Sequence, residues 1–343
     1  MRTTPRTALL LALLGVGLIT VDSSQALEKR VAKSKALAHR QVHAPAKVSF
    51  VGRPAKILLA SHAEPWREAR PLAVQSGSAL VIEQGGGDLL FQKNASAIAP
   101  IASITKLMTA MVVLDSEPNL QAAISIADDD VDLLRGSHSR LYVGAVMTRE
   151  TALLLALMSS ENRAANALAR NYPGGMPAFL AAMNFKAQAL GMVDTHFEDP
   201  TGLTSNNVST AHDLAKMVAA AHRYPLIRQW STTPEAIVEV NGRELAFHNT
   251  NPLVKSAAWD VGLSKTGYIH EAGKCLVMQA RVADRPVVIV LLDSVGKLTR
   301  VGDANRIKRW MESAQARLSV HTQASHKPAT HAALVRVNQR RPG

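Results

Sequence analysis

Ser103-Ile104-Thr105-Lys106, continued by Leu107-Met108-Thr109-Ala110-Met111, is the stretch that decides the fold of this 343-residue chain. If a helix begins at Ser103, the i, i+3 spacing places the serine and lysine side chains on one face. Apolar residues recur at helical spacing: Ile104, Leu107, Met111 and Leu114. The stretch therefore predicts an amphipathic helix that buries one face and holds a serine beside a lysine. A serine in the first turn also leaves its backbone N–H free to stabilise an oxyanion.

Two further polar motifs follow in a fixed order, Ser160-Glu161-Asn162 and Lys265-Thr266-Gly267. With the first motif they contain the groups for acyl transfer through a serine ester, with lysine in place of histidine as the base. A lysine acts as a base only where burial or a nearby cation lowers its pKa, and Lys265 is a candidate for that cation. The three motifs together predict a nucleophilic Ser103 with Lys106 as its base.

The second motif is expected to relay protons and to hold the substrate. Ser160 can pass a proton between the lysine and the leaving amine. The Asn162 amide can bind a substrate carbonyl with one end and position the lysine with the other. For this motif taken alone, a helix N-cap is the competing interpretation, because a serine commonly precedes a new helix.

The third motif predicts an edge strand that grips the substrate. Lys265 and Thr266 are expected to bind a substrate carboxylate, and Gly267 lets the substrate backbone lie against the strand. The backbone N–H of Tyr268 is the expected second oxyanion donor. An ordinary strand end with a solvated lysine is the alternative for the triplet alone.

The remaining polar clusters are interpreted as structural. Ser294-Val295-Gly296-Lys297 repeats the serine–lysine spacing but comes last in the chain and opens no amphipathic helix. The single cysteine, Cys275, lies in an apolar strand-like run and is expected to be buried and inert. The acidic residues at 128–132 lack the spacing of a calcium loop, and His39 with His43 lacks the glutamate of a zinc motif. No metal or cofactor is therefore expected.

Both ends of the chain differ from its middle. Residues 1–26 combine a basic head, an apolar run and a small-x-Ala site, which predicts a secretory signal peptide; an uncleaved anchor is the alternative. The net charge of +12 resides in the ends, chiefly a basic, poorly ordered linker at 27–72 and a basic, disordered tail at 319–343. Residues 73–318 are balanced, which disfavours a nucleic-acid partner. The flanks suit anionic wall polymers or lipid head groups, or no partner at all.

Residues 73–318 are enough for one large α+β domain. A hairpin is expected from 79–83 and 89–92, with later strands at 237–240, 245–247, 262–266, 276–281 and 287–292. Helices are expected at 104–114, 150–157, 163–169, 177–190, 211–221 and 304–317. Strands at both ends with helices between them predict one antiparallel sheet with an inserted helical subdomain.

With its motifs in this order, the chain resembles the penicillin-recognising serine D-Ala-D-Ala peptidases, most closely the D-alanyl-D-alanine endopeptidase (penicillin-binding protein 7 type) branch. The resemblance rests on four stretches within about residues 76–317, namely 100–106, 157–163, 197–203 and 262–268. It implies a DD-peptidase/β-lactamase-like α/β (α+β) fold with a five-stranded antiparallel sheet, flanking helices and a cleft at the sheet edge. The turn at 199–203 is expected to border that cleft, without an assignable catalytic role.

The family likeness also implies an activity. Ser103 would be acylated with Lys106 as base, Ser160 and Asn162 as relay and clamp, and Lys265-Thr266-Gly267 as the strand wall. The implied partners are the peptide stems of peptidoglycan, with β-lactams as covalent inhibitors and no cofactor. The implied location is the periplasm, with no integral membrane span after signal cleavage.

The motifs alone do not separate two activities. An endopeptidase cuts the D-Ala–diaminopimelate cross-link, whereas a carboxypeptidase removes the terminal D-Ala of a pentapeptide stem. Related carboxypeptidases carry a further β domain and an amphipathic membrane helix, whereas residues 319–343 are polar and basic, which favours the endopeptidase. A class A β-lactamase is disfavoured because no Glu-x-x-Leu-Asn follows Asn162. A non-catalytic wall-binding protein stays an alternative.

Overall fold

The computed structural model describes residues 72–325, and the fold given below is that of this segment. The predicted signal peptide, nearly all of the predicted linker, His39 with His43, and the tail from residue 326 onward lie outside the described residues. Between residues 72 and 325, no helix has the length and apolar content needed to cross a membrane.

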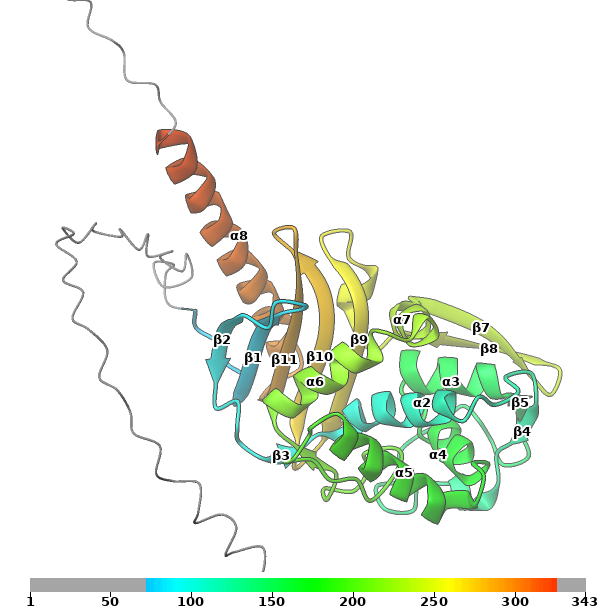
Figure 1. The fold of residues 1–343 in the computed structure, drawn as a ribbon. Coiled ribbons are helices and arrows are strands. Elements are labelled where there is room, and N and C mark those ends of the chain that lie inside the picture. Colours follow the sequence, from blue (N-terminus) through cyan, green and yellow to red (C-terminus); the bar gives the residue numbers. More distant parts are fainter. Residues whose placement is uncertain (1–71, 326–343) are drawn as a thin grey trace, which may run out of the picture. The chain divides into compact units, whose positions relative to one another are not determined.

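A five-stranded antiparallel sheet runs through this segment in the order β2-β1-β11-β10-β9 (Figure 1). Its strands come from both ends of the segment: β1 Ser78–Glu83, β2 Leu89–Lys93, β9 Asp260–Ile269, β10 Gly273–Val282 and β11 Arg285–Ser294. The register places Lys265 of β9 opposite Val277 of β10, and Val277 opposite Val290 of β11. The predicted sheet is confirmed, and β9, which carries the third motif, is its edge strand.

Successive residues of a strand point to opposite sides of the sheet, so this sheet has two faces to bury. One helix packs against each face. Val277 and Val290 belong to the apolar layer that packs against α6 Ala211–Ala221. Their neighbours along the strands, Met278 and Ile289, belong to the layer that packs against α8 Thr299–Ser325. Helices α6 and α8 thus cover opposite faces of the sheet (Figure 1).

The chain between β2 and β9 forms the predicted helical part. Its helices are the 3₁₀ turn η1 Ala102–Thr105, α2 Lys106–Asp115, the short 3₁₀ turn η2 Asp128–Asp130, α3 Arg149–Met158, α4 Asn162–Arg170, α5 Gly175–Ala189, α6, α7 Pro225–Thr232 and the 3₁₀ turn η3 Pro252–Lys255. The helix expected to be amphipathic, α2, is instead buried at every residue from Lys106 to Val113. It packs against α3, α4, α5 and α6, so no face is left for solvent.

Three small strand pairs complete the described segment: β3 Ala99–Pro100 with β6 Val208–Ser209, β4 Ala123–Ser125 with β5 Val146–Thr148, and β7 Glu235–Val240 with β8 Arg243–His248. The strands predicted at 237–240 and 245–247 thus form a separate hairpin. Helix α7 was not predicted. It is short and begins at a proline, and a proline is as typical of a turn as of the first residue of a helix. Helix α8 extends beyond the predicted 304–317 at both ends.

The serine of the second serine–lysine pair in the sequence, Ser294, has a structural role, as expected. Ser294 ends β11 and is 1% exposed. Its Oγ lies 2.7 Å from Ser76 Oγ, which donates to Asp303 Oδ2 at 2.6 Å. These bonds tie the segment before β1 to α8, and no lysine takes part in them.

Candidate active site

Ser103 and Lys106 meet at the junction of η1 and α2. The Lys106 amine donates to Ser103 Oγ at 2.9 Å, so the predicted pair is formed. Ser103 lies in the tight 3₁₀ turn and not in the α-helix itself. The preceding residue, Ala102, has φ +48, a conformation that costs free energy for a residue with a side chain. The turn is therefore strained and is held by what packs around it.

Lys106 is wholly buried, with 0% of its surface exposed. Its amine donates to Asn162 Oδ1 at 2.6 Å and to the Thr201 carbonyl at 2.8 Å, as well as to the serine. Burial lowers the pKa of Lys106 to about 7, against an opposing effect of the nearby Asp199 and Glu161 carboxylates. Burial, and not the cation of Lys265 that the sequence suggested, brings this amine to a pKa suited to a base at neutral pH.

Lys265 and Ser160 form a second lysine–serine pair. The Lys265 amine donates to Ser160 Oγ at 2.9 Å and to the Thr266 carbonyl at 3.0 Å. Lys265 is 1% exposed, and burial, together with the positive charges of Lys106 and Arg300, lowers its pKa well below the ordinary value. Ser160 has φ +64 between α3 and α4, Glu161 is the N-cap of α4 and Asn162 is its first residue, but no side chain of the motif makes a capping hydrogen bond.

Thr266 and Gly267 continue the wall along β9, and Thr266 Oγ1 donates to Thr250 Oγ1 at 2.6 Å. A Cβ on Gly267 would lie 2.9 Å from the Ile101 carbonyl and 3.1 Å from Ser103 N. The glycine therefore lets the turn that carries Ser103 pack against β9. Gly267 is expected to make room for a substrate backbone, and in the structure it also makes room for the enzyme's own backbone at Ser103.

Tyr268 follows on the same strand. Its side chain is 58% exposed, and the Lys274 amine lies 3.7 Å from the centre of its ring. Because Gly267 brings the Ser103 N–H against β9, the backbone N–H of Tyr268 stays the predicted second oxyanion donor.

The sequence interpretation missed what holds these groups in place. Asp199 Oδ1 accepts from the backbone N–H groups of Thr201 and Gly202, each at 2.5 Å, and Oδ2 accepts from Thr204 N at 2.8 Å. This carboxylate fixes the turn whose Thr201 carbonyl receives the Lys106 amine. Asp199-Pro200-Thr201-Gly202 combines the residue types of a side-chain-bonded turn, so the signal was present in the sequence.

Two other positioning contacts carry no sequence signal. Ser137 Oγ accepts from the Asn162 Nδ2 amide at 2.9 Å, which orients the amide oxygen toward Lys106. A Cβ on Gly202, which has φ +81, would lie 1.9 Å from the Ala102 carbonyl oxygen. The turn at 199–203 therefore packs directly against the strained turn of Ser103, a relation between segments about a hundred residues apart.

The clusters interpreted as structural are so in the structure. Cys275 is buried, and burial raises the pKa of its thiol to about 11. The acidic run was expected to be a solvated turn or the start of a helix; residues 128–130 form η2, and Asp130 within it is 2% exposed and pairs with Arg170 at 2.8 Å. Within residues 72–325, no group of three or more histidine, cysteine or acidic side chains could hold a metal ion.

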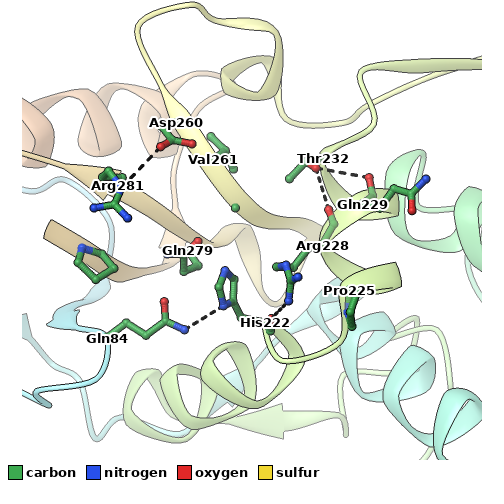
Figure 2. Close-up of a pocket in the computed structure, with 12 residues that line it drawn as sticks. Gln84, His222, Pro225, Arg228, Gln229, Thr232, Asp260, Val261, Gln279 and Arg281 are labelled. Atoms are coloured by element: carbon green, nitrogen blue, oxygen red, sulfur yellow. Dashed lines mark hydrogen bonds and ion pairs between the residues drawn. The ribbon is translucent and has the colours of Figure 1, made fainter. Parts of the chain in front are cut away.

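A separate cavity of about 550 Å³ lies between the end of α6, α7 and the start of β9 (Figure 2). His222 Nδ1 in this cavity lies 3.1 Å from Gln84 Nε2, and burial lowers the pKa of the imidazole. A Cβ on Gly262 would strike Gln279 Oε1 at 2.0 Å. None of the motif residues described above lines this cavity, so it is distinct from the serine–lysine site.

Comparison with known proteins agrees with this geometry. The model of the S11 peptidase family, described as D-alanyl-D-alanine carboxypeptidase, matches residues 65–296. A D-alanyl-D-alanine endopeptidase of Pseudomonas aeruginosa is 52% identical over 242 residues, which cover 70% of this chain and 78% of the relative. A D-alanyl-D-alanine endopeptidase of Escherichia coli is 44% identical over 244 residues, covering 71% and 79%.

Solved structures show the same fold. The crystal structure of the Streptomyces K15 DD-transpeptidase is similar with a TM-score of 0.66 and 29% sequence identity, covering 71% of this chain and 99% of that chain. The predicted DD-peptidase-like fold is thereby confirmed. The chain belongs to the S11 family of serine-type D-Ala-D-Ala peptidases.

Proposed function

We propose that this protein is a periplasmic serine-type D-alanyl-D-alanine endopeptidase that cuts D-Ala–diaminopimelate cross-links in peptidoglycan. The observation that carries the proposal is the Lys106 amine, wholly buried, with a pKa of about 7 and 2.9 Å from Ser103 Oγ. The choice of endopeptidase is supported by the names of the two relatives from Pseudomonas aeruginosa and Escherichia coli.

The first chemical step is acylation of Ser103. Its Oγ attacks the D-Ala carbonyl carbon of the cross-link, and the hydroxyl proton passes to the neutral Lys106 amine. The carbonyl oxygen becomes an oxyanion, which the backbone N–H groups of Ser103 and Tyr268 stabilise. The C–N bond then breaks, and the proton held by Lys106 passes by way of Ser160, which is hydrogen-bonded to Lys265, to the leaving amine, so that Lys106 is neutral again.

The second step is hydrolysis of the acyl-enzyme. Water attacks the ester carbonyl, and Lys106 accepts a proton from it and returns that proton to Ser103 Oγ as the ester C–O bond breaks, which restores the serine hydroxyl. Asn162 holds the substrate carbonyl region and the lysine, while Lys265 and Thr266 bind the carboxylate on the D-centre of the leaving group. β-Lactams acylate the same serine.

The location follows from the predicted signal peptide at residues 1–26, which delivers the enzyme to its polymeric substrate. The basic segments at 27–72 and 319–343 suit attraction to anionic wall material.

Chromatography of muropeptide digests tests the proposal. Purified enzyme is incubated with cross-linked dimers and, separately, with monomeric pentapeptide stems. We expect monomers to form from the dimers faster than D-Ala is released from the pentapeptides. The reverse preference would assign the carboxypeptidase activity instead. Equal yields from wild type and Ser103→Ala would leave only a non-catalytic wall-binding protein.

A further inference from the structure

A small cavity of about 320 Å³ opens beside the loop that carries Ser160. We call it the side pocket; its lining includes His138, Arg140, Ser159, Glu161, Phe247 and His248. Glu161 is the one residue of the three motifs that lines the side pocket. The proposed reaction does not use this pocket.

The walls of the side pocket are continuations of the segments that build the reaction centre. Ser159 and Glu161 flank Ser160 directly. His138 follows Ser137, whose Oγ accepts from the Asn162 amide at 2.9 Å.

Strand β8 supplies another wall of the side pocket, through Phe247 and His248. His248 ends this strand two residues before Thr250, which accepts a hydrogen bond from Thr266 Oγ1 at 2.6 Å. The side pocket therefore lies next to Ser160 and Thr266, the groups that receive the leaving amine and its carboxylate.

The charge of the side pocket comes from Arg140. Arg140 is exposed, and its guanidinium lies 5.5 Å from the ring centre of Phe247, which is 3% exposed, so the cation rests against a buried aromatic ring. Within the described segment this guanidinium forms no ion pair. The Glu161 carboxylate is already engaged, because it accepts from Ser139 Oγ at 2.7 Å and from Arg140 N at 3.4 Å. The pocket thus presents a positioned cation without a partner carboxylate.

The two candidate substrates differ on the leaving-group side. When a carboxypeptidase releases D-Ala, the leaving group ends at the carboxylate held by Lys265 and Thr266. When a cross-link is cut, the leaving group is a whole second peptide stem, which bears further carboxylates. A guanidinium in a pocket beside the clamp is chemically matched to such a group.

We propose that the side pocket binds a carboxylate of the leaving peptide stem through Arg140, and that this contact makes the enzyme prefer cross-linked dimers to pentapeptides. The inference rests on the proposed endopeptidase function. It makes Arg140 a specificity-determining residue, because the contact exists only with the larger leaving group.

The test compares Arg140→Ala and Arg140→Met with wild type on both substrates. A contact of a partly solvated arginine with a carboxylate is expected to change kcat/KM for the dimer about fivefold to tenfold, mostly through KM. D-Ala release from pentapeptide and acylation by fluorescent penicillin should stay within about twofold, since neither uses the contact. Arg140→Met keeps an unbranched side chain on Phe247, so a loss shared by both variants reports the charge.

The control variant is Arg281→Ala, which removes an exposed arginine from the separate cavity of Figure 2 and should leave both activities unchanged. A second arm uses dimers in which the carboxylates of the leaving stem are amidated, except the one on the D-centre that Lys265 and Thr266 bind. Wild type should lose about as much rate on these dimers as Arg140→Ala loses on the native ones, and the variant should lose little more.

Three outcomes are distinguishable. Wild type that cuts the dimer while Arg140→Ala cuts it equally well overturns this inference alone. A variant that loses dimer cleavage and penicillin acylation in equal measure also overturns it, because the arginine then supports the site and not the choice of substrate. Wild type that leaves the dimer intact while releasing D-Ala overturns the proposed function and this inference together.

Discussion

The Lys265 amine lies 2.9 Å from Ser160 Oγ although the two residues are 105 positions apart in the chain. Lys106 and Ser103 form a matching pair at the same distance. The two lysines are close enough that the positive charge of Lys106 lowers the pKa of Lys265. Two buried ammonium groups in one site repel each other, so protonation of one disfavours protonation of the other. The site is thus arranged to keep one amine neutral.

Replacing either lysine should stop acylation without unfolding the protein. Lys106→Ala removes the base and Lys265→Ala removes the partner of Ser160, so labelling by fluorescent penicillin should fall at least about a hundredfold in each variant. Far-UV circular dichroism should stay unchanged, since neither lysine belongs to the apolar layers on the sheet. Normal labelling of one variant at matched concentration would remove that lysine from the mechanism.

Acylation should rise with pH around neutrality. Lys106 must be neutral to accept the proton of Ser103, and its pKa is about 7, so the rate increases from below pH 7 to above it. A flat profile across that range would contradict the assignment of Lys106 as base.

The free energy of unfolding should depend on the protonation of Lys106 within a defined pH range. Between about pH 7 and the ordinary lysine pKa of 10.5, the unfolded chain binds more protons than the folded one, so the free energy of unfolding rises with pH. Below pH 7 both states hold the proton, and the effect is constant. Urea unfolding at several pH values measures the slope, which Lys106→Met should reduce.

Asp199→Asn should slow acylation about tenfold, because a charged acceptor of backbone N–H groups is lost from the turn that holds Lys106. The same change should move the midpoint of the pH profile downward, since the Asp199 charge raises the pKa of Lys106. The matched control is Glu198→Gln, a neighbouring carboxylate whose side chain is 47% exposed. A midpoint that moves upward in Asp199→Asn would refute this electrostatic role.

Gly202→Ala should damage the site far more than Gly191→Ala. Both glycines have positive φ, +81 and +69, so each substitution carries a backbone cost of about 1–2 kcal/mol. Only the Cβ at 202 meets the Ala102 carbonyl, at 1.9 Å, whereas nothing lies within 4 Å of the one at 191. Thermal unfolding and penicillin labelling separate the two effects, and equal losses in both variants would show that the contact does not matter.

Nitrocefin should give a burst of about one equivalent with no turnover after it, because no Glu-x-x-Leu-Asn string follows Asn162 to activate a deacylating water. Mass spectrometry should find the adduct on Ser103. Continued hydrolysis at a constant rate would show that another group activates the water.

Much of the fold was predictable because it is locally encoded. Short apolar segments predicted the strands, and the three glycines at 85–87 between two such segments predicted the first hairpin; both are confirmed in β1, β2, β10 and β11. The helix after Ser103 was predicted, but its burial on all sides was not, since that depends on four other helices packing around it. The helix α7 was missed because it is short and its stability comes from packing against β9 and α3.

By itself, the sequence determined which groups are the candidates for the reaction: a serine and lysine one turn apart, a second serine with an asparagine, and a second lysine on a strand. Side-chain chemistry and local spacing are properties of the sequence, so these groups could be identified from the sequence alone. Tertiary structure alone decided how the amine of Lys106 becomes a base, because its pKa depends on burial and not on sequence neighbours. It also decided that Asp199 and Gly202 hold the strained turn of Ser103, because only folding brings those backbones into contact.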